Sequence, residues 1–279
     1  MAIEIGYSGS KGTHLARAYN LNQPSHRSAA LPTGITPFPQ WGTITYFCYC
    51  FDSTYNAFTV TLRRRFARNF FYRINYSYSK AIDDGSELQG QGAGGYAGLQ
   101  DSTNRALERG RADFDMPHVF TTSFSWVVPW TGNVFIRGWQ LAGSGIAHTG
   151  TPFTPQVSNA NLNLGEASRP NRIAKGTLPN PSVKAWFDVA AFPVVPDGSF
   201  SDGNSGRNIL DAPGFLGINL ALYRNFAIHE KGNLQFRWEV FNVLNHTNFT
   251  PSAASTDPVV FVNAPNAGTL TAAGASRQM

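Results

Sequence analysis

The densest group of reactive side chains in this sequence lies in "ERGRADFDMPH", residues 108–118. Asp113, Asp115 and His118 could act there as an acid–base pair or as three ligands of a metal ion. No nucleophile elbow, zinc-ligand spacing or phosphate-binding loop accompanies them in the sequence. A salt-bridged end of a loop that leads into a strand explains the same residues, and this interpretation outweighs the catalytic one. We therefore expect no catalytic residue, no metal site and no cofactor, and we expect that the protein is not an enzyme.

Three further segments are candidates for chemistry. "QGQGAGGYAGLQ" (89–100) is rich in glycine, but it lacks the strand–turn–helix context of a phosphate site, so we expect a flexible loop. In "FNVLNHTNF" (241–249) the Asn and Thr side chains are expected to satisfy backbone groups in turns. Cys48 and Cys50 lie two residues apart, which in an extended strand is too far for good disulfide geometry, so we expect two small unpaired side chains.

The composition of the 279 residues favours an all-β protein. Charged residues make up 14% and aromatic residues 13%, and the segments between apolar runs are rich in Gly, Pro, Asn, Ser and Thr. The net charge of +5 is spread thinly apart from Arg63–Arg65, so we expect no nucleic-acid partner. The sequence contains no run of about 18 apolar residues, the length that a membrane-spanning helix needs.

Period-two alternation predicts the strands that must position these residues. In "NFFYRINYSYSKAIDD" (69–84), the aromatic and aliphatic side chains occupy even positions and polar side chains occupy most odd ones. The same alternation predicts strands at 2–9, 54–66, 70–82, 118–128, 138–148, 215–226 and 233–243. "TITYFCYCF" (43–51) also alternates, and we place it in the external loop after 2–9, because counting it as a crossing would reverse the direction of that strand.

The connections between these strands alternate between short and long. A strict rhythm of this kind places all long loops at one end of an antiparallel sheet, which is typical of outer-membrane barrels with short periplasmic turns and long external loops. We therefore predict an antiparallel up-and-down transmembrane β-barrel wall, with Asp113, Asp115 and His118 in an external loop. The alternative is a secreted soluble β-sandwich that binds polysaccharide through exposed aromatic side chains.

The mid-strand charges favour the barrel. An arginine that faced lipid at the membrane midplane would cost about 2–4 kcal/mol, whereas one that faces a wet lumen costs little. The candidate lumen-facing residues are Arg63, Arg65, Arg73, Arg237 and Glu239. In a sandwich, the side chains of the opposite face would be packed between two sheets; those that decide the matter are Phe58, Leu62, Tyr72, Phe124, Leu220 and Trp238.

An ordered set of phrases along the chain also resembles a known family. The phrases include "GYSGSKGTHLARAYNLNQP", "YNAFTVTLRRRF", "NYSYSKAIDD", "ERGRADFDMPHVF", "GWQLAGSGIAHTGTPFTP", "RPN", "WFDVAAF", "GRNILDAPGF" and "NLQFRWEVFNVLNHTNF". Together they are similar to the C-terminal part of Oar-like TonB-dependent outer-membrane transporters. The resemblance implies a barrel of about 22 strands with a plug domain inside it, located in the bacterial outer membrane. The implied partners are outer-membrane lipid, the plug, the TonB complex and an unidentified siderophore, saccharide or peptide.

Residues 1–279 would then be the C-terminal portion of the barrel domain. The sequence shows no plug, TonB box, signal peptide, early strands or final aromatic-ended strand, so the resemblance implies a fragment of the wall that does not transport a ligand alone. A sheet of these strands would have two free edges, and open edges are untenable in lipid, so the strand count also leads us to expect a fragment of a larger barrel.

Overall fold

The computed structural model describes residues 1–24, 28–31, 34–67, 69–86, 99–133, 135–157, 168–196, 201–228, 232–249, 260–274 and 276–278. Among these residues, no helix is long and apolar enough to cross a membrane.

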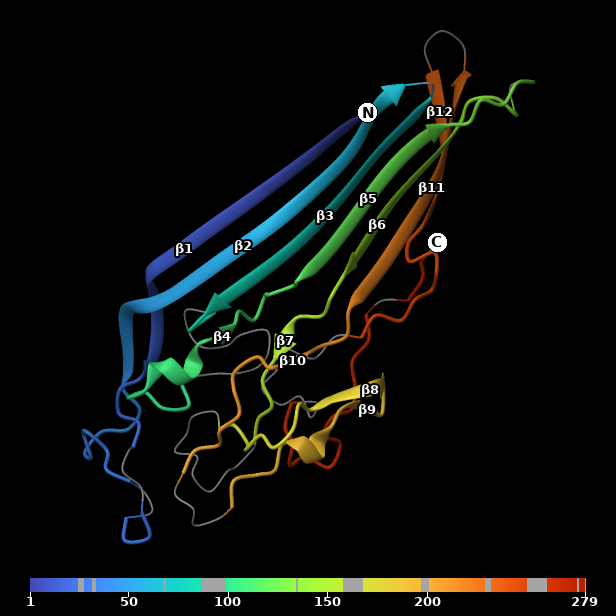
Figure 1. Cartoon of the computed structure of the whole chain (residues 1–279). Coiled ribbons are helices and arrows are strands. Elements are labelled where there is room, and N and C mark those ends of the chain that lie inside the picture. Colours follow the sequence, from blue (N-terminus) through green and yellow to red (C-terminus); the bar gives the residue numbers. More distant parts are fainter. Residues whose placement is uncertain are drawn as a thin grey trace.

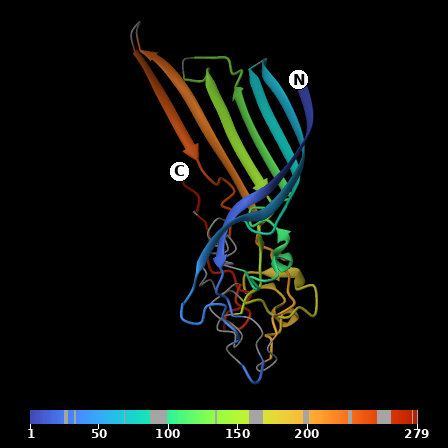
Figure 2. The same cartoon turned by 90° about the vertical axis from the view of Figure 1, so that its left-hand side faces the viewer.

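Long antiparallel strands form one open sheet, and every neighbour along it is antiparallel (Figure 1). The sheet order is β1-β2-β3-β5-β6-β11-β12, and short β4 pairs with the end of β3. The bounds are β1 Ala2–Asn20, β2 Thr45–Ala67, β3 Phe70–Asp83, β4 Gly110–Arg111, β5 His118–Val127, β6 Trp139–His148, β11 Phe215–Ile228 and β12 Gly232–Val240. The predicted fold class is confirmed, and Figure 2 shows β1 and β12 at opposite margins of the curved sheet.

The predicted rhythm of the connections is also present. The links β2–β3, β5–β6 and β11–β12 are short and lie at one end of the sheet, whereas β1–β2, β3–β5 and β6–β11 are joined by long segments at the other end (Figure 1). Asn69, with a positive φ of 63°, occupies the tight β2–β3 link. The long segments and the residues after β12 gather at the same end and form what we call the loop layer.

The prediction for 43–51 was wrong in one respect. These residues do lie at the long-loop end, but Thr45 to Phe51 continue β2 without interruption and pair with Leu15 to Asn20 of β1. The two strands therefore extend beyond the end of β3 and bend there (Figure 1). The bend coincides with register shifts between Gly12 and Ala16, which are β-bulges of the kind that re-aim a strand.

The prediction for the cysteines was also wrong, because Cys48 and Cys50 form a disulfide. Leu15 pairs with Phe51 while Ala16 pairs with Tyr49, so Cys50 is the extra residue of a bulge. A bulge shortens the strand locally. The two Cα atoms lie 5.3 Å apart, within the range that a disulfide allows, whereas residues two apart in a regular strand are about 6.7 Å apart.

Register shows that the sheet has one apolar and one polar face. Directly paired residues of an antiparallel sheet point to the same side. One row across five strands contains Tyr72, Phe124, Gly143, Leu220 and Val240. A neighbouring row on the other side contains Arg63, Arg73, Ser123, Ser144 and Asn219.

The apolar face is not the core of a sandwich. Phe58 is 44% exposed and Trp238 is 51% exposed. Leu62, Tyr72, Phe124 and Leu220 are not buried either. The aromatic side chains therefore point away from the protein, as in a barrel whose outer wall faces lipid. This exposure rules out the soluble β-sandwich alternative.

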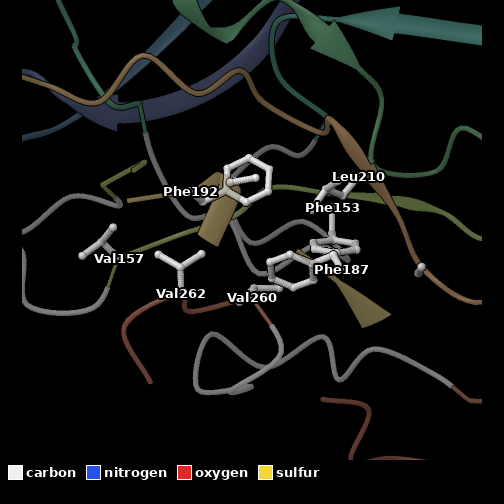
Figure 3. Packing of buried hydrophobic residues seen from close by; sticks show 9 residues of the cluster. Phe153, Val157, Phe187, Phe192, Leu210, Val260 and Val262 are labelled. Carbon is white, nitrogen blue, oxygen red and sulfur yellow. The ribbon is translucent and has the colours of Figure 1, made fainter. Parts of the chain in front are cut away.

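The loop layer contains the main hydrophobic core of the described residues (Figure 3). Its buried members are Phe153, Val157, Phe187, Ala191, Phe192, Leu210, Ala212, Val260 and Val262. Short elements hold them in place: β7 Pro152–Phe153, β8 Thr177–Ser182, β9 Ala185–Phe187, η2 Val189–Ala191 and β10 Leu210–Asp211. Residues 260–270 join this core through backbone hydrogen bonds from Gln156 to Val260 (2.8 Å) and from Val262 to Gln156 (2.9 Å).

Residues 87–98, most of the predicted glycine-rich loop, lie outside the described part of the chain. The prediction for 241–249 is confirmed for Asn242, whereas Asn248 satisfies the backbone of a strand rather than of a turn. The Asn242 side chain donates to the His246 carbonyl (3.0 Å) and accepts from its N–H (3.0 Å). Asn248 does the same for the backbone of Leu216, at 2.9 and 2.8 Å.

Candidate functional site

The polar face carries a connected set of hydrogen bonds across β2, β3 and β5. The Thr61 hydroxyl donates to Asn75 (3.0 Å), and the Asn75 amide donates to the Thr121 hydroxyl (3.0 Å). Arg73 donates to the same Asn75 oxygen at 3.2 Å. Side chains of neighbouring strands on this face therefore hydrogen-bond to one another, which fixes the positions of their donors and acceptors.

The predicted lumen-facing charges lie on this face wherever pairing assigns a side. Arg63 forms an ion pair with Glu4 of β1, and the paired rows place Arg73 directly opposite Arg63. Arg237 forms an ion pair with Glu239, to which Tyr223 also donates a hydrogen bond at 3.2 Å.

Arg65 is the exception. It lies in the register shift between Arg64 and Ala67, so pairing does not assign its face.

A hollow of about 260 Å³ opens on the same face between β6, β11 and β12. Small side chains, Ala142, Ser144 and Ala221, leave the space, and Tyr223 and Glu239 border it. Because a pocket with a few placed polar groups is the usual form of a small-molecule binding site, this hollow is a candidate contact for a small ligand on the polar face.

A buried ionic network joins the loop layer to the end of β3. The Arg207 guanidinium is almost fully buried and forms ion pairs with Asp83 and with Asp113 (3.4 Å). It also donates to the Glu108 carbonyl oxygen at 2.8 Å. Asn208 adds a hydrogen bond to Asp113 at 2.6 Å. Buried charges are tolerated when they are paired in this way, so Arg207 holds three separate segments together.

Two further ion-paired arginines extend this network, the buried Arg169 and the half-buried Arg111. Arg169 forms an ion pair with Glu108 (3.2 Å). Arg111 forms ion pairs with Asp115 (2.8 Å) and Asp211. Burial lowers the pKa of Arg111, but the hydrogen bonds and charges of the two aspartates outweigh it, and the pKa lies above its ordinary value. The guanidinium therefore keeps its charge and remains a permanent link between β4 and β10.

The structure separates the three residues of the catalytic hypothesis. Asp113 and Asp115 are buried at the base of the loop layer, where the salt-bridged interpretation placed them. His118 lies on the apolar face, where its ring packs against that of Tyr78. Its Nδ1 forms a hydrogen bond of 2.8 Å with the Tyr76 hydroxyl. Among the described residues, no hydrogen bond or ion pair joins His118 to either aspartate, and no three His, Cys, Asp or Glu side chains are grouped to hold a metal.

Sequence reasoning missed Arg207, Asn208 and Arg169. A signal was available, because they belong to the phrases "GRNILDAPGF" and "RPN", and their partners Asp83 and Asp113 belong to "NYSYSKAIDD" and "ERGRADFDMPHVF". Charged residues are sparse in this chain, so charges that recur within these phrases were candidates for pairing with one another. Their pairing over about 120 residues of sequence could not be read from spacing.

Comparison with known proteins agrees with this geometry. No curated protein matches the chain. The structure is similar to that of the outer membrane transporter YddB from Escherichia coli, with a TM-score of 0.55 and 11% identity, over 99% of this chain and 29% of the transporter. At that identity the similarity shows the fold alone. The family described as outer membrane beta barrel domain matches residues 1–279. The chain therefore belongs to the outer membrane β-barrel domain family and is located in the bacterial outer membrane.

Proposed function

We propose that this chain is part of the barrel wall of an Oar-like TonB-dependent transporter, which takes up a ligand across the outer membrane rather than catalysing a reaction. The observation that carries the proposal is the two-faced sheet: an exposed aromatic face, an opposite face with hydrogen-bonded polar groups and arginines, and long loops at one end only. The ordered family phrases point to the same transporters.

In this proposal the loop layer receives the ligand and the polar face borders its route. Arg63, Arg73, Arg237 and Glu239 would line that route or contact a plug, and the hollow beside Tyr223 would be one contact on the way. The chain spans 29% of the length of the E. coli transporter that it resembles. The remaining strands of the barrel, the plug and the contact with TonB are therefore proposed for the intact protein. Among the described residues, β1 and β12 each leave one edge of the sheet without a partner strand, and the proposal therefore includes further strands, because open edges are untenable in lipid.

Growth of the source bacterium on a range of nutrients tests the proposal, even though the ligand is unidentified. We would compare the wild type, a deletion of the gene for this protein and a deletion of tonB on iron chelates, oligosaccharides and peptides as limiting nutrients. We expect at least one nutrient on which both deletions lose growth and the complemented gene restores it. A nutrient that requires the gene but not tonB would contradict TonB dependence and would indicate a passive pore.

A further inference from the structure

One arginine departs from the two-faced pattern. Arg224 of β11 is paired with Trp139 of β6 and Phe236 of β12, so it lies on the apolar, lipid-facing side of the sheet. It is only 4% exposed. Ile228, where β11 ends, is four residues away, next to the short β11–β12 link. Because short links of such barrels lie in the periplasm, Arg224 is near the inner surface of the outer membrane.

The surroundings of Arg224 are aromatic. Its guanidinium carbon lies 4.5 Å from the ring centre of Phe226 and 5.7 Å from that of Trp139. Trp139 packs edge-on against Phe236, and Phe226 packs against Phe135. Clustered Trp and Phe side chains at the end of a strand form the interfacial girdle of a barrel, so the guanidinium lies at the level of the lipid headgroups.

Two of the three donor nitrogens of Arg224 lack a hydrogen-bond partner among the residues that the structure describes. These two atoms, Nε and Nη1, are buried. The aromatic rings offset part of the charge, but they offer no good acceptor for these N–H groups. Arg237, one strand away on the polar face, pairs with Glu239. Arg224 therefore has N–H donors that would bind an anionic oxygen acceptor, and it lies on the face of the sheet that contacts lipid.

We propose that Arg224, with Trp139 and Phe226 as flanking walls, binds the phosphate of a phospholipid headgroup in the inner leaflet of the outer membrane. A guanidinium fits a phosphate through two parallel hydrogen bonds, and the headgroup layer supplies phosphates at this depth. Because the guanidinium is buried in the structure, the proposal requires the half-buried Phe226 ring to move aside for the phosphate. Gly138 lies beside the guanidinium: its φ is +82°, and a Cβ there would be in ordinary contact with Nη1 at 3.8 Å. This inference depends on the membrane location alone and is independent of TonB.

Native mass spectrometry of the full-length protein tests the proposal. The wild type and variants would be reconstituted in nanodiscs of phosphatidylethanolamine and phosphatidylglycerol and then released into detergent. We expect one phospholipid to stay bound to the wild type. Arg224→Gln should lower the bound fraction by about tenfold or more, as expected for the loss of one charge-assisted hydrogen bond. Arg224→Lys, which keeps the charge but loses the fork, should be intermediate.

Arg237→Gln is the matched control, because it removes an arginine from the adjacent strand on the opposite face, and it should retain the lipid as the wild type does. Heat-modifiable migration on gels verifies that each variant is folded. Equal retention by the wild type and Arg224→Gln would overturn the proposal. In lipid-free detergent, an inorganic phosphate adduct without phospholipid retention would overturn the assignment to a lipid.

Discussion

Arg207 is the residue on which the attachment of the loop layer depends most directly. It pairs with two carboxylates and with the backbone of Glu108, and all of these groups are buried. Arg207→Met keeps the length of the side chain but leaves Asp83 and Asp113 without their cationic partner. Removing one partner of a buried ion pair destabilises by about 3–5 kcal/mol, so we expect the loop layer to detach from the end of β3.

Protease digestion of intact cells measures this effect, because only external segments are cut. Cleavage of Arg207→Met should be at least tenfold faster than that of the wild type. Arg109→Met is the control, since Arg109 is exposed beside the same network and should leave the rate unchanged. Equal rates for Arg207→Met and wild type would show that the network does not hold the layer.

For single residues, the sequence predicted the face of the sheet on which a side chain lies better than it predicted the ion-pair or disulfide partner of that side chain. Alternation placed Arg63, Arg73, Arg237 and Glu239 on the polar face, because side-chain direction in a strand follows from position alone. The pairing of Arg207 with Asp83 depends on how long loops fold back, which local spacing does not encode. Cys48–Cys50 was missed for a related reason: a bulge is a property of two paired strands and not of one.

Among the elements, β3 offers the cleanest test of the face assignment. Ile74 lies mid-strand on the apolar face, opposite Leu62, and Ser77 lies nearby on the polar face, opposite Thr59. We expect Ile74→Arg to destabilise the full-length protein in lipid by about 2–4 kcal/mol, the cost of a cation that faces the membrane midplane. Ser77→Arg should change stability by less than about 1 kcal/mol, because that charge stays hydrated.

Urea titration in phospholipid vesicles, followed by heat-modifiable gel migration, gives both values. If Ser77→Arg were the more destabilising of the two, the polar face would be the one in contact with lipid.

The packing of the β6–β11 segment depends on a glycine. A Cβ on Gly150 would lie 1.7 Å from the carbonyl oxygen of Ala212, so the two segments touch backbone to backbone. Gly150→Ala must push them apart next to Phe153 and Leu210 of the buried core. We expect a loss of about 1–3 kcal/mol in the stability of the loop layer, as for an overpacked core. Hydrogen exchange should rise in 149–157 and 205–212 but not in β5, and uniform exchange would contradict this.

For the whole molecule, the open edges lead to a prediction. β1 and β12 each have a single strand partner among the described residues. The 279-residue chain alone, refolded in detergent, should therefore associate through these edges and should not show the heat-modifiable migration of a closed barrel. Light scattering and gel migration check this, and a monodisperse, heat-modifiable monomer would show that the chain closes by itself.

The overall architecture was the easiest part to predict, and the loop layer the hardest. The seven main strands repeat one local pattern, and each was recognised from its own residues. The core around Phe153, Phe187 and Phe192 shows no such pattern, because it draws side chains from short elements and from residues 260–262. Contacts of this kind are long-range in sequence, so neither alternation nor composition reveals them.

The Cys48–Cys50 disulfide has a consequence for how the protein is made. It lies at the bend of the β1–β2 extension, on the external side of the membrane. Disulfides form in the bacterial periplasm, which the chain must traverse before insertion. We therefore expect the bond to close during export, before insertion, so that the extension passes outward already bent. The bulge of one residue, which brings the two cysteines within bonding distance, would then let oxidation precede insertion.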